Sequence, residues 1–272
     1  MRIVVCVKHV PDISSPRGFD SASRTVRTTE DSTLNEVDEN AVEAALQLAE
    51  AAEEDAEVVA LTMGPEIAVD AARRALQLGA DRGVHLCDEA LAGADYGVTA
   101  RVLAAAVRAE ESVDVVVTGM TALDGLGSVV PSLLAAELGW PQATVAREVQ
   151  LAGGVVTATR DVDGVAETWQ LSLPGVVSVT DVTNEPRLPR MKEMMAARSK
   201  PVRTLTAADL GLGADDLAGR TRVRSAEPRP PREPEIVMDD GTGGRRIAEY
   251  LFDHGLIEQG LIEHGPLGKE NR

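Results

Sequence analysis

Short apolar runs alternate with amphipathic helical patterns over about the first 140 residues of the chain. The strand-like runs cover 3–7, 56–64, 82–88 and 113–119, and the helical patterns between them cover 35–52, 65–79 and 95–110. Each helical pattern is long enough to connect two parallel strands, which need a crossover of about a dozen residues or more. The alternation therefore predicts a doubly wound α/β domain with a mostly parallel sheet and right-handed crossovers.

The first helical pattern places its apolar residues on one face. Val42, Ala45, Leu46 and Ala49 recur at i, i+3, i+4 and i+7, and Asn35 stands where an N-cap residue is expected. Aromatic residues make up only 2% of the chain, so the core must consist of Val, Ala, Leu and Ile. Such a core suits parallel strands and closely packed helices.

The pattern changes between residues 144 and 180. Apolar and polar residues alternate there with period two, and Gly153-Gly154 and Asp163-Gly164 are typical of hairpin turns. We therefore expect an antiparallel extension of the α/β domain.

The C-terminal part of the chain has a different composition. The stretch at 226–235 is rich in proline and charge, which is typical of a linker, and a final helical pattern follows at 243–254. We therefore divide the chain into an α/β domain at 1–205 and a linker with a C-terminal arm at 206–272.

Charge and cysteine content limit the function. A net charge of −17 argues against nucleic-acid binding, because phosphate contacts need a basic surface. Cys6 and Cys87 belong to no CxxC pair, so neither a zinc site nor a redox dithiol is indicated. The N-terminal apolar run is too short for a signal peptide, and no segment approaches the roughly 20 apolar residues of a membrane span. We expect a cytoplasmic protein without membrane insertion that binds proteins and small molecules.

One short segment of this acidic chain is strongly basic. Residues 187–203 contain a single acid, Glu193, and six basic residues: Arg187, Arg190, Lys192, Arg198, Lys200 and Arg203. Met191, Met194 and Met195 lie within the segment at i, i+3 and i+4. Such a stripe is typical of an amphipathic helix docked on its own domain, and also of an exposed recognition segment, because methionine adapts to several partner surfaces. The residue pattern alone leaves both interpretations open.

Ligands of open α/β sheets bind outside the carboxyl ends of the strands. Three loops are expected there: the one after Val7, the turn at 63–65 and the glycine-rich loop at 119–128. The last opens a helix near Ser128, so its backbone N–H groups and the helix dipole favour a phosphate. It matches neither GxxxxGK[ST] nor GxGxxG, and a plain glycine turn is an equally good interpretation. Because no arrangement of histidine, serine or carboxylate indicates catalysis, the residues favour a nucleotide-binding module over an enzyme.

Several stretches of the chain resemble a known family. They are VCVKHVPD, LNEVDENAVEAALQL, GADRGVH, VVVTGMTALDG, GWPQAT and DVDGVAETWQLSLPGVVSVTDVTNEPR. From Met1 to about Leu205 the chain resembles the beta subunit of electron transfer flavoprotein, the FixA-type small subunit. The resemblance implies a Rossmann-like domain that binds an adenine nucleotide, and a C-terminal arm that contacts the alpha subunit.

The resemblance also implies that AMP binds this subunit, mainly through backbone contacts. The matching positions are Cys6, Asn35, Glu36, Val37, Asp38, Met63, Gly119, Met120, Thr121, Ala122, Leu123, Asp124, Gly125, Leu126, Gly127, Ser128, Val129 and Val130. Many relatives carry amide or hydroxyl side chains where this chain has Val129 and Val130. Ser128 is therefore the main polar side chain expected near the phosphate.

The redox FAD of the family is held mainly by the alpha subunit, and the beta subunit covers part of its isoalloxazine. Ile13 and Val37 match covering positions, where some relatives carry aromatic residues. Asp161 matches an acid that in relatives pairs with an arginine of the alpha subunit. The resemblance therefore implies an aliphatic cover over the flavin in this chain.

The segment at 184–200 resembles the recognition loop with which the family docks on its partners. Met191 matches the apolar anchor of that loop, which is usually leucine. The residues that flank the anchor are Arg190, Lys192, Met194 and Met195.

The resemblance implies the small subunit of a heterodimeric electron carrier without bond chemistry of its own. It would take electrons from dehydrogenases, such as the acyl-CoA dehydrogenases of fatty acid oxidation, and pass them to a quinone oxidoreductase or another acceptor. An alternative is a FixAB-type bifurcating flavoprotein, with a second FAD in place of AMP and NADH as donor. A remote alternative is a stand-alone adenine-nucleotide-binding protein of the universal stress type, which is shorter and lacks both the antiparallel extension and the recognition loop.

Overall fold

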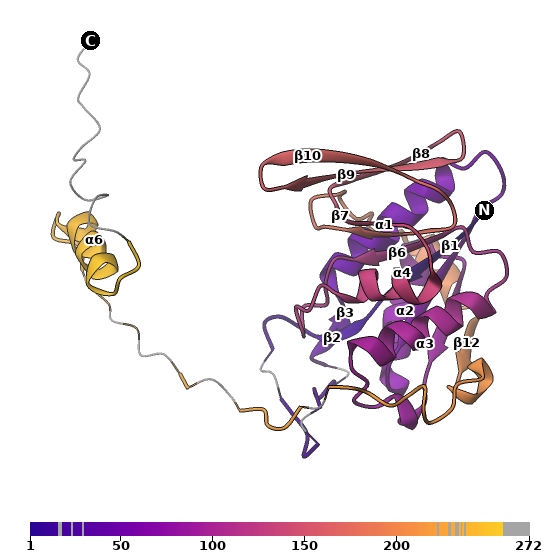
Figure 1. Ribbon diagram of the computed structural model, residues 1–272, viewed down its shortest axis with the longest axis horizontal. Helices are drawn as coiled ribbons and strands as arrows, with labels where there is room; N and C mark the ends of the chain where they lie inside the picture. Colours follow the sequence, from indigo (N-terminus) through magenta and orange to yellow (C-terminus); the bar gives the residue numbers. More distant parts are fainter. Residues whose placement is uncertain are drawn as a thin grey trace, which may run out of the picture. The chain divides into compact units, whose positions relative to one another are not determined.

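The computed structural model describes residues 1–257, apart from 16, 17, 23, 29, 222, 228, 229, 232, 233, 235 and 237. The chain forms two compact units, Met1–Ala226 and Glu227–Arg272. The first unit holds the α/β domain drawn in Figure 1. The end of the predicted C-terminal arm, residues 258–272, lies outside the described residues.

A parallel sheet forms the centre of the first unit (Figure 1). Its seven strands lie in the order β12-β5-β4-β1-β6-β11-β7, and all neighbouring strands run parallel. The strands are β1 (Arg2–Cys6), β4 (Glu57–Met63), β5 (Arg82–Leu86), β6 (Val115–Gly119), β7 (Gln142–Ala146), β11 (Gly175–Val179) and β12 (Val202–Leu205). The predicted doubly wound α/β class is therefore confirmed.

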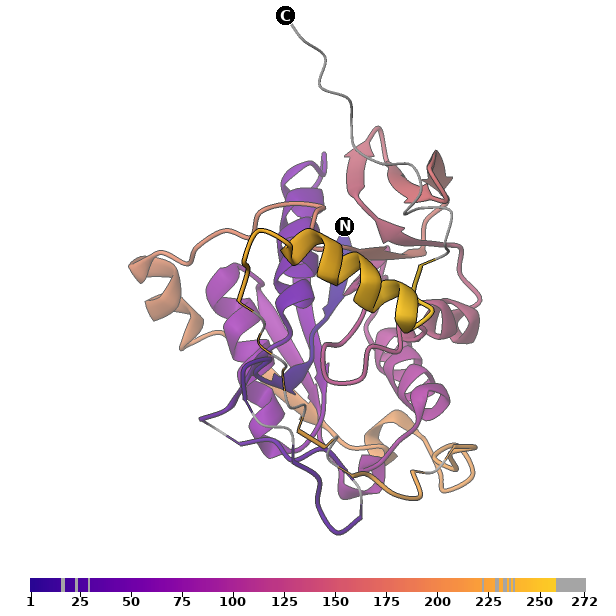
Figure 2. The same ribbon diagram turned by 90° about the vertical axis from the view of Figure 1, so that its left-hand side faces the viewer.

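Helices cover both faces of this sheet (Figure 2). One face packs on α1 (Glu36–Glu50) and α2 (Val69–Leu78), the other on α3 (Tyr96–Ala109) and α4 (Val130–Leu138). Successive residues of a strand point to opposite faces, so Val5 joins the first core cluster and Val4 the second. Short 3-10 turns occupy Glu66–Ala68, Glu89–Leu91 and Ala208–Leu210.

The strand order reverses at β1, which positions the candidate site. The chain runs from β1 to β4 and β5 on one side of β1, and then returns to β6 on the other side. A crevice forms at the carboxyl ends of the strands where the order of a doubly wound sheet reverses. The loops that follow β1 and β6 therefore meet beside the first turn of α1.

The period-two stretch divides between two sheets. β8 (Glu148–Ala152), β9 (Val155–Val162) and β10 (Val165–Leu171) form the predicted antiparallel extension, and the turn glycines Gly153 and Gly164 have the positive φ of tight hairpins. The expectation was wrong at both ends of the stretch, because β7 and β11 belong to the parallel sheet. A small hairpin of β2 (His9–Pro11) and β3 (Ser32–Leu34) follows β1.

The C-terminal helix agrees with its prediction to within one residue. α6 spans Gly243–Asp253 in the second unit. The division of the chain after Ala226 lies C-terminal to the predicted boundary at residue 205, because Leu210, Leu212 and Leu217 still pack on the core of the first unit. Within the described residues, every helix is too short or too polar to span a lipid bilayer.

Candidate functional site

Asn35 ties the glycine-rich loop to the start of α1. Its Nδ2 donates to the carbonyl of Thr121 and its Oδ1 accepts from the N–H of Leu123, both at 2.9 Å. Asn35 occupies the N-cap position, as expected, but its side chain makes no capping hydrogen bond. The side chain is fully buried and holds the loop instead, so it positions backbone groups at the carboxyl edge of the sheet.

Asp38 is a buried carboxylate between the ends of β1 and β6. Its Oδ2 accepts from the N–H of Lys8 at 2.8 Å. A Cβ on Gly119 would lie 2.4 Å from its Oδ1, so a larger residue at this position would have to displace the buried carboxyl group. Burial raises the pKa of Asp38 to about 7, although hydrogen bonds from Asn35, Lys8 and Gly119 act in the opposite direction.

Cys6 lies next to this carboxylate at the end of β1. Burial, and then the charge of Asp38, raises the pKa of its thiol to about 12. The thiolate is the reactive form of cysteine, so Cys6 is not a nucleophile at neutral pH. Its place in the site is that of an apolar wall.

Asp124 fixes the middle of the glycine-rich loop. Its Oδ1 lies 2.7 Å from Lys8 Nζ and its Oδ2 lies 3.1 Å from Arg27 Nη2. The Asp124 side chain is only 4% exposed, whereas Lys8 and Arg27 are 40% and 20% exposed. The carboxylate is thus engaged within the chain, and its two bases are held beside the loop.

The second half of the loop presents backbone donors. Leu126 and Ser128 have positive φ angles of 48° and 53°, a left-handed conformation that turns the backbone sharply. Within the described part of the chain, no acceptor contacts the N–H groups of Gly127, Ser128 and Val129. α4 then begins at Val130, two residues after the predicted start. Three N–H groups without a protein acceptor among the described residues therefore directly precede the N-terminus of α4, and Ser128 and Val129 are exposed.

The other predicted nucleotide positions lie within this loop or at the carboxyl edge of the sheet. Val37 is buried, and its backbone lies 3.2 Å from a Cβ built on Gly119. Glu36 opens α1 at the surface, and Met63 ends β4 against the second core cluster. The remaining loop positions, Met120, Ala122 and Gly125, continue the chain between these anchors. The structure thus gathers the predicted nucleotide residues at one edge of the sheet.

The two other positions expected near FAD, Ile13 and Asp161, belong to other parts of the domain. Ile13 follows β2 and is 64% exposed. Asp161 lies on β9, where its Oδ2 is 2.8 Å from Nε of Arg147 and its side chain is 58% exposed. Among the described residues, no hydrogen bond or ion pair joins the Asp161 side chain to the glycine-rich loop.

The methionine segment is exposed. α5 (Met191–Ala197) leaves Met191 69% and Met195 65% exposed, whereas Met194 is partly buried. The interpretation of the stripe as a helix docked on its own domain through its methionines is therefore wrong for two of the three. Leu188, just before the helix, is 85% exposed and was missed by the sequence analysis. Its position between Arg187 and Pro189 offered no periodic signal.

Half of the basic charge in this segment is used inside the chain. Arg187 pairs with Glu43 and Glu50, and Arg203 pairs with Glu110. Lys200 donates to three backbone carbonyls at the end of α2. The outward charge of the segment therefore comes from the remaining bases, Arg190, Lys192 and Arg198.

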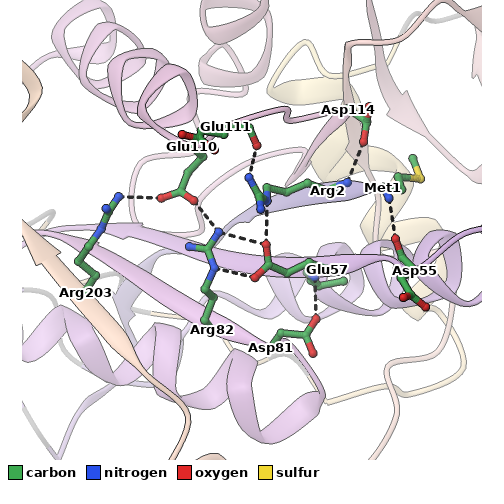
Figure 3. Close-up of polar contacts among 11 residues, drawn as sticks. Met1, Arg2, Asp55, Glu57, Asp81, Arg82, Glu110, Glu111, Asp114 and Arg203 are labelled. Carbon is green, nitrogen blue, oxygen red and sulfur yellow. Dashed lines mark hydrogen bonds and ion pairs between the residues drawn. The ribbon is translucent and has the colours of Figure 1, made fainter.

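A cavity lies at the opposite, amino-terminal edge of the sheet. It has a volume of about 330 Å³ and is lined by Arg2, Arg82 and Arg203 among others. Figure 3 shows Glu57 between Arg2 and Arg82, and Glu110 between Arg82 and Arg203. Each of these guanidinium groups already has a carboxylate partner, so the network fixes strand ends. Among the described residues, no group of histidine, cysteine and carboxylate side chains has the arrangement of a metal site.

Comparison with known proteins gives a consistent result. Residues 24–210 match the family model for the electron transfer flavoprotein domain. The chain is 40% identical over 264 residues to the electron transfer flavoprotein subunit beta of Mycobacterium tuberculosis (strain ATCC 25618 / H37Rv), covering 94% of this chain and 99% of the relative. It is 34% identical over 275 residues to the subunit beta of Megasphaera elsdenii (96% and 100%). It is 32% identical over 266 residues to the caffeyl-CoA reductase-Etf complex subunit CarD of Acetobacterium woodii (96% and 100%).

Proposed function

The chain belongs to the electron transfer flavoprotein family, among its beta subunits, and on this premise we propose that it forms a heterodimer with an alpha subunit and carries electrons from dehydrogenases to a further acceptor. Acyl-CoA dehydrogenases are the expected donors, and a quinone oxidoreductase is the expected acceptor. The proposal rests above all on similarity to beta subunits along nearly the whole length of each relative.

The chemistry of the site agrees with a subunit that does no bond chemistry. The Cys6 thiol is protonated at neutral pH, and the Asp124 carboxylate is neutralised by its two bases. Asp38 is buried beneath the loop, where its oxygens accept backbone hydrogen bonds. These groups shape the edge of the sheet and leave the redox chemistry to a bound flavin.

We assign the AMP site to the carboxyl edge of the sheet. The N–H groups of Gly127, Ser128 and Val129, which have no acceptor among the described residues, suit a phosphate, as does the N-terminus of α4. Thr121 Oγ1 is buried without a partner among the described residues, and a nucleotide would supply one. Val129 adds no side-chain donor, so backbone groups and the Ser128 hydroxyl carry the phosphate contacts. The residues present therefore fit an adenine nucleotide.

FAD, held mainly by the alpha subunit, supplies the one-electron and two-electron chemistry of the complex. From this chain, the exposed Ile13 is the side chain available to cover the flavin, whereas Val37 contributes from a buried position. Asp161 already pairs with Arg147, so an alpha-subunit arginine would share or replace that partner.

We place the dehydrogenase contact on the segment at 184–200. Its exposed Met191 and Met195 offer flexible apolar surface, and Arg190, Lys192 and Arg198 surround it with positive charge. A small apolar contact with a charged rim favours rapid association and rapid release. An electron carrier needs both, because it alternates between donor and acceptor.

A second candidate is a bifurcating flavoprotein, in which a second FAD replaces AMP and NADH is the donor. The observation that keeps it as a candidate is the similarity to a subunit of the caffeyl-CoA reductase-Etf complex, whose name joins an electron transfer flavoprotein to a reductase of CoA esters. The adenylate half of FAD presents the same chemistry as AMP to the loop at 119–130. The stand-alone stress protein, by contrast, is disfavoured by the family to which the chain belongs.

The nucleotide content of the co-expressed heterodimer tests this assignment. We expect one FAD and one AMP per complex, and a melting temperature that falls when AMP is removed and recovers when it is added. AMP at a hundredfold excess over its dissociation constant should stabilise the folded heterodimer by about 2.7 kcal/mol. Two FAD molecules and no response to AMP would favour the bifurcating candidate. One FAD per complex with no AMP, and no response of the melting temperature to AMP, would refute the assigned site.

A further inference from the structure

The helix that carries the exposed methionines cannot fix its own position by burial. α5 has seven residues, and isolated helices below about 12 residues are marginal in water. Ala197 is its one buried residue, whereas Met191 and Met195 point mostly into solvent. Contacts outside the helix must therefore hold it in place.

Lys200 provides such a contact on the C-terminal side of α5. Its Nζ lies 3.3 Å from the carbonyl oxygens of Leu76 and Gly79 and 2.6 Å from that of Ala80. The last carbonyls of a helix lack intrahelical donors and carry the negative end of its dipole. The ammonium group thus caps the end of α2 and ties the chain after α5 to it.

The backbone of Lys200 is held as well. Arg73, on α2, donates through Nη1 to the Lys200 carbonyl at 2.8 Å. Side chain and main chain of this residue are therefore both bound to α2, which lies beside α5 in Figure 2.

Arg187 provides the corresponding contact on the N-terminal side. Its Nε and Nη2 donate to the two oxygens of Glu43 at 2.6 and 3.0 Å, and its Nη1 donates to Glu50 at 2.7 Å. The Glu43 side chain is only 7% exposed. Bidentate pairs of this kind restrict orientation as well as distance.

Two asparagines extend the N-terminal contact. Asn40 donates through Nδ2 to the carbonyl of Asn184 at 2.8 Å, and Asn184 donates through Nδ2 to the carbonyl of Asn40 at 3.0 Å. The segment at 184–200 is thus bound to α1 at one end and to α2 at the other, and its apolar surface lies between the two.

We propose that Arg187 and Lys200 are positioning residues, which hold α5 in the orientation that presents Met191 and Met195 to a redox partner. Ordering a mobile segment at the moment of binding lowers affinity, so a segment ordered in advance binds more tightly. This inference rests on the proposed docking function of the segment. It assigns two of the six basic residues of the segment, Arg187 and Lys200, to the framework of the fold.

The test uses the co-expressed heterodimer with Lys200→Met, Arg187→Gln and the control Arg203→Gln. Arg203→Gln also removes a positive charge close to the segment, but its partner Glu110 is the C-cap residue of α3, which covers the opposite face of the sheet from α1 and α2. Amide hydrogen exchange of residues 191–197 measures the order of α5, and steady-state reduction by an acyl-CoA dehydrogenase measures docking. Melting curves of all variants confirm that the heterodimer is folded.

For Lys200→Met and Arg187→Gln we expect exchange in α5 to accelerate about tenfold, the effect of losing hydrogen bonds to a charged group. KM for the heterodimer should rise by about the same factor, with kcat within about twofold, because positioning acts on binding. The control should leave both measurements at the wild-type value.

The two measurements separate this inference from the function on which it rests. Unchanged exchange in Lys200→Met would overturn the positioning role. A raised KM without faster exchange would also overturn it, since Lys200 would then contact the partner directly. Faster exchange with an unchanged KM would refute the docking function of the segment and, with it, the inference.

Discussion

Replacing Asp38 with asparagine tests the buried carboxylate at the carboxyl edge of the sheet. Burial raises the pKa of Asp38 from 3.8 to about 7. Because the folded pKa lies above the unfolded one, folding takes up a proton between these values, and stability falls as pH rises through this window. The free energy of unfolding falls by about 1.4 kcal/mol for each pH unit in this window, and by less near pH 7, where Asp38 is partly ionised in the folded protein. Between pH 5 and pH 7 the loss is therefore about 2 kcal/mol.

Asparagine keeps the shape of Asp38 and does not ionise, so Asp38→Asn should lose this pH dependence. In a folded unit of this size, about 2 kcal/mol corresponds to roughly 4 to 8 °C in melting temperature. Calorimetry of the heterodimer at pH 5, 6, 7 and 8 measures the difference between wild type and variant. We expect the wild type to lose stability relative to the variant as pH rises. A difference that is constant over this range would refute a raised pKa.

Three further substitutions probe the docking segment, the loop and the opposite edge. Met191→Ala should lower kcat/KM with a cognate dehydrogenase roughly thirtyfold, about 2 kcal/mol, without changing the melting temperature. If kcat/KM falls with Leu188→Ala and not with Met191→Ala, the apolar anchor is the more exposed Leu188. Asp124→Asn leaves two partly exposed bases without their carboxylate, so stability should fall by about 2 kcal/mol and AMP content should fall with it. Full AMP occupancy in this variant would contradict the loop's role. Glu110→Gln should lower the melting temperature but leave KM for dehydrogenases unchanged, and a raised KM would place the amino-terminal edge in the docking surface.

The fold was predictable where apolar periodicity was strong. The alternation of strands and helices up to β6 followed from the sequence, since each element carries its own pattern. The end of β7 was assigned to the antiparallel extension because apolar and polar residues alternate from residue 144 onward. In the structure β7 is instead an edge strand of the parallel sheet, where Gln142 and Val145 are exposed. β11 is buried throughout, and its apolar run at 175–179 was a signal for a central parallel strand that the period-two interpretation hid.

The place of the glycine-rich loop at the carboxyl edge of the sheet was predictable, whereas the contacts that hold the loop were not. The resemblance located the loop at 119–130, whereas the role of Asn35 depends on contacts with Thr121 and Leu123 far along the chain. The roles of Arg187 and Lys200 likewise depend on partners that are distant in the sequence. Sequence gives their charge, but their acceptors on α1 and α2 become neighbours only in the folded domain.

Electron transfer to the assembled heterodimer tests the central claim most directly. A dehydrogenase reduced by its substrate is mixed in a stopped-flow instrument with the alpha subunit, either alone or in complex with this chain, and flavin absorbance is followed. The account predicts rapid bleaching of the flavin in the complex and slow bleaching without this chain, because the docking segment belongs to the beta subunit. Equal rates for both samples would contradict the assignment of this chain as the subunit that brings the dehydrogenase to the flavin.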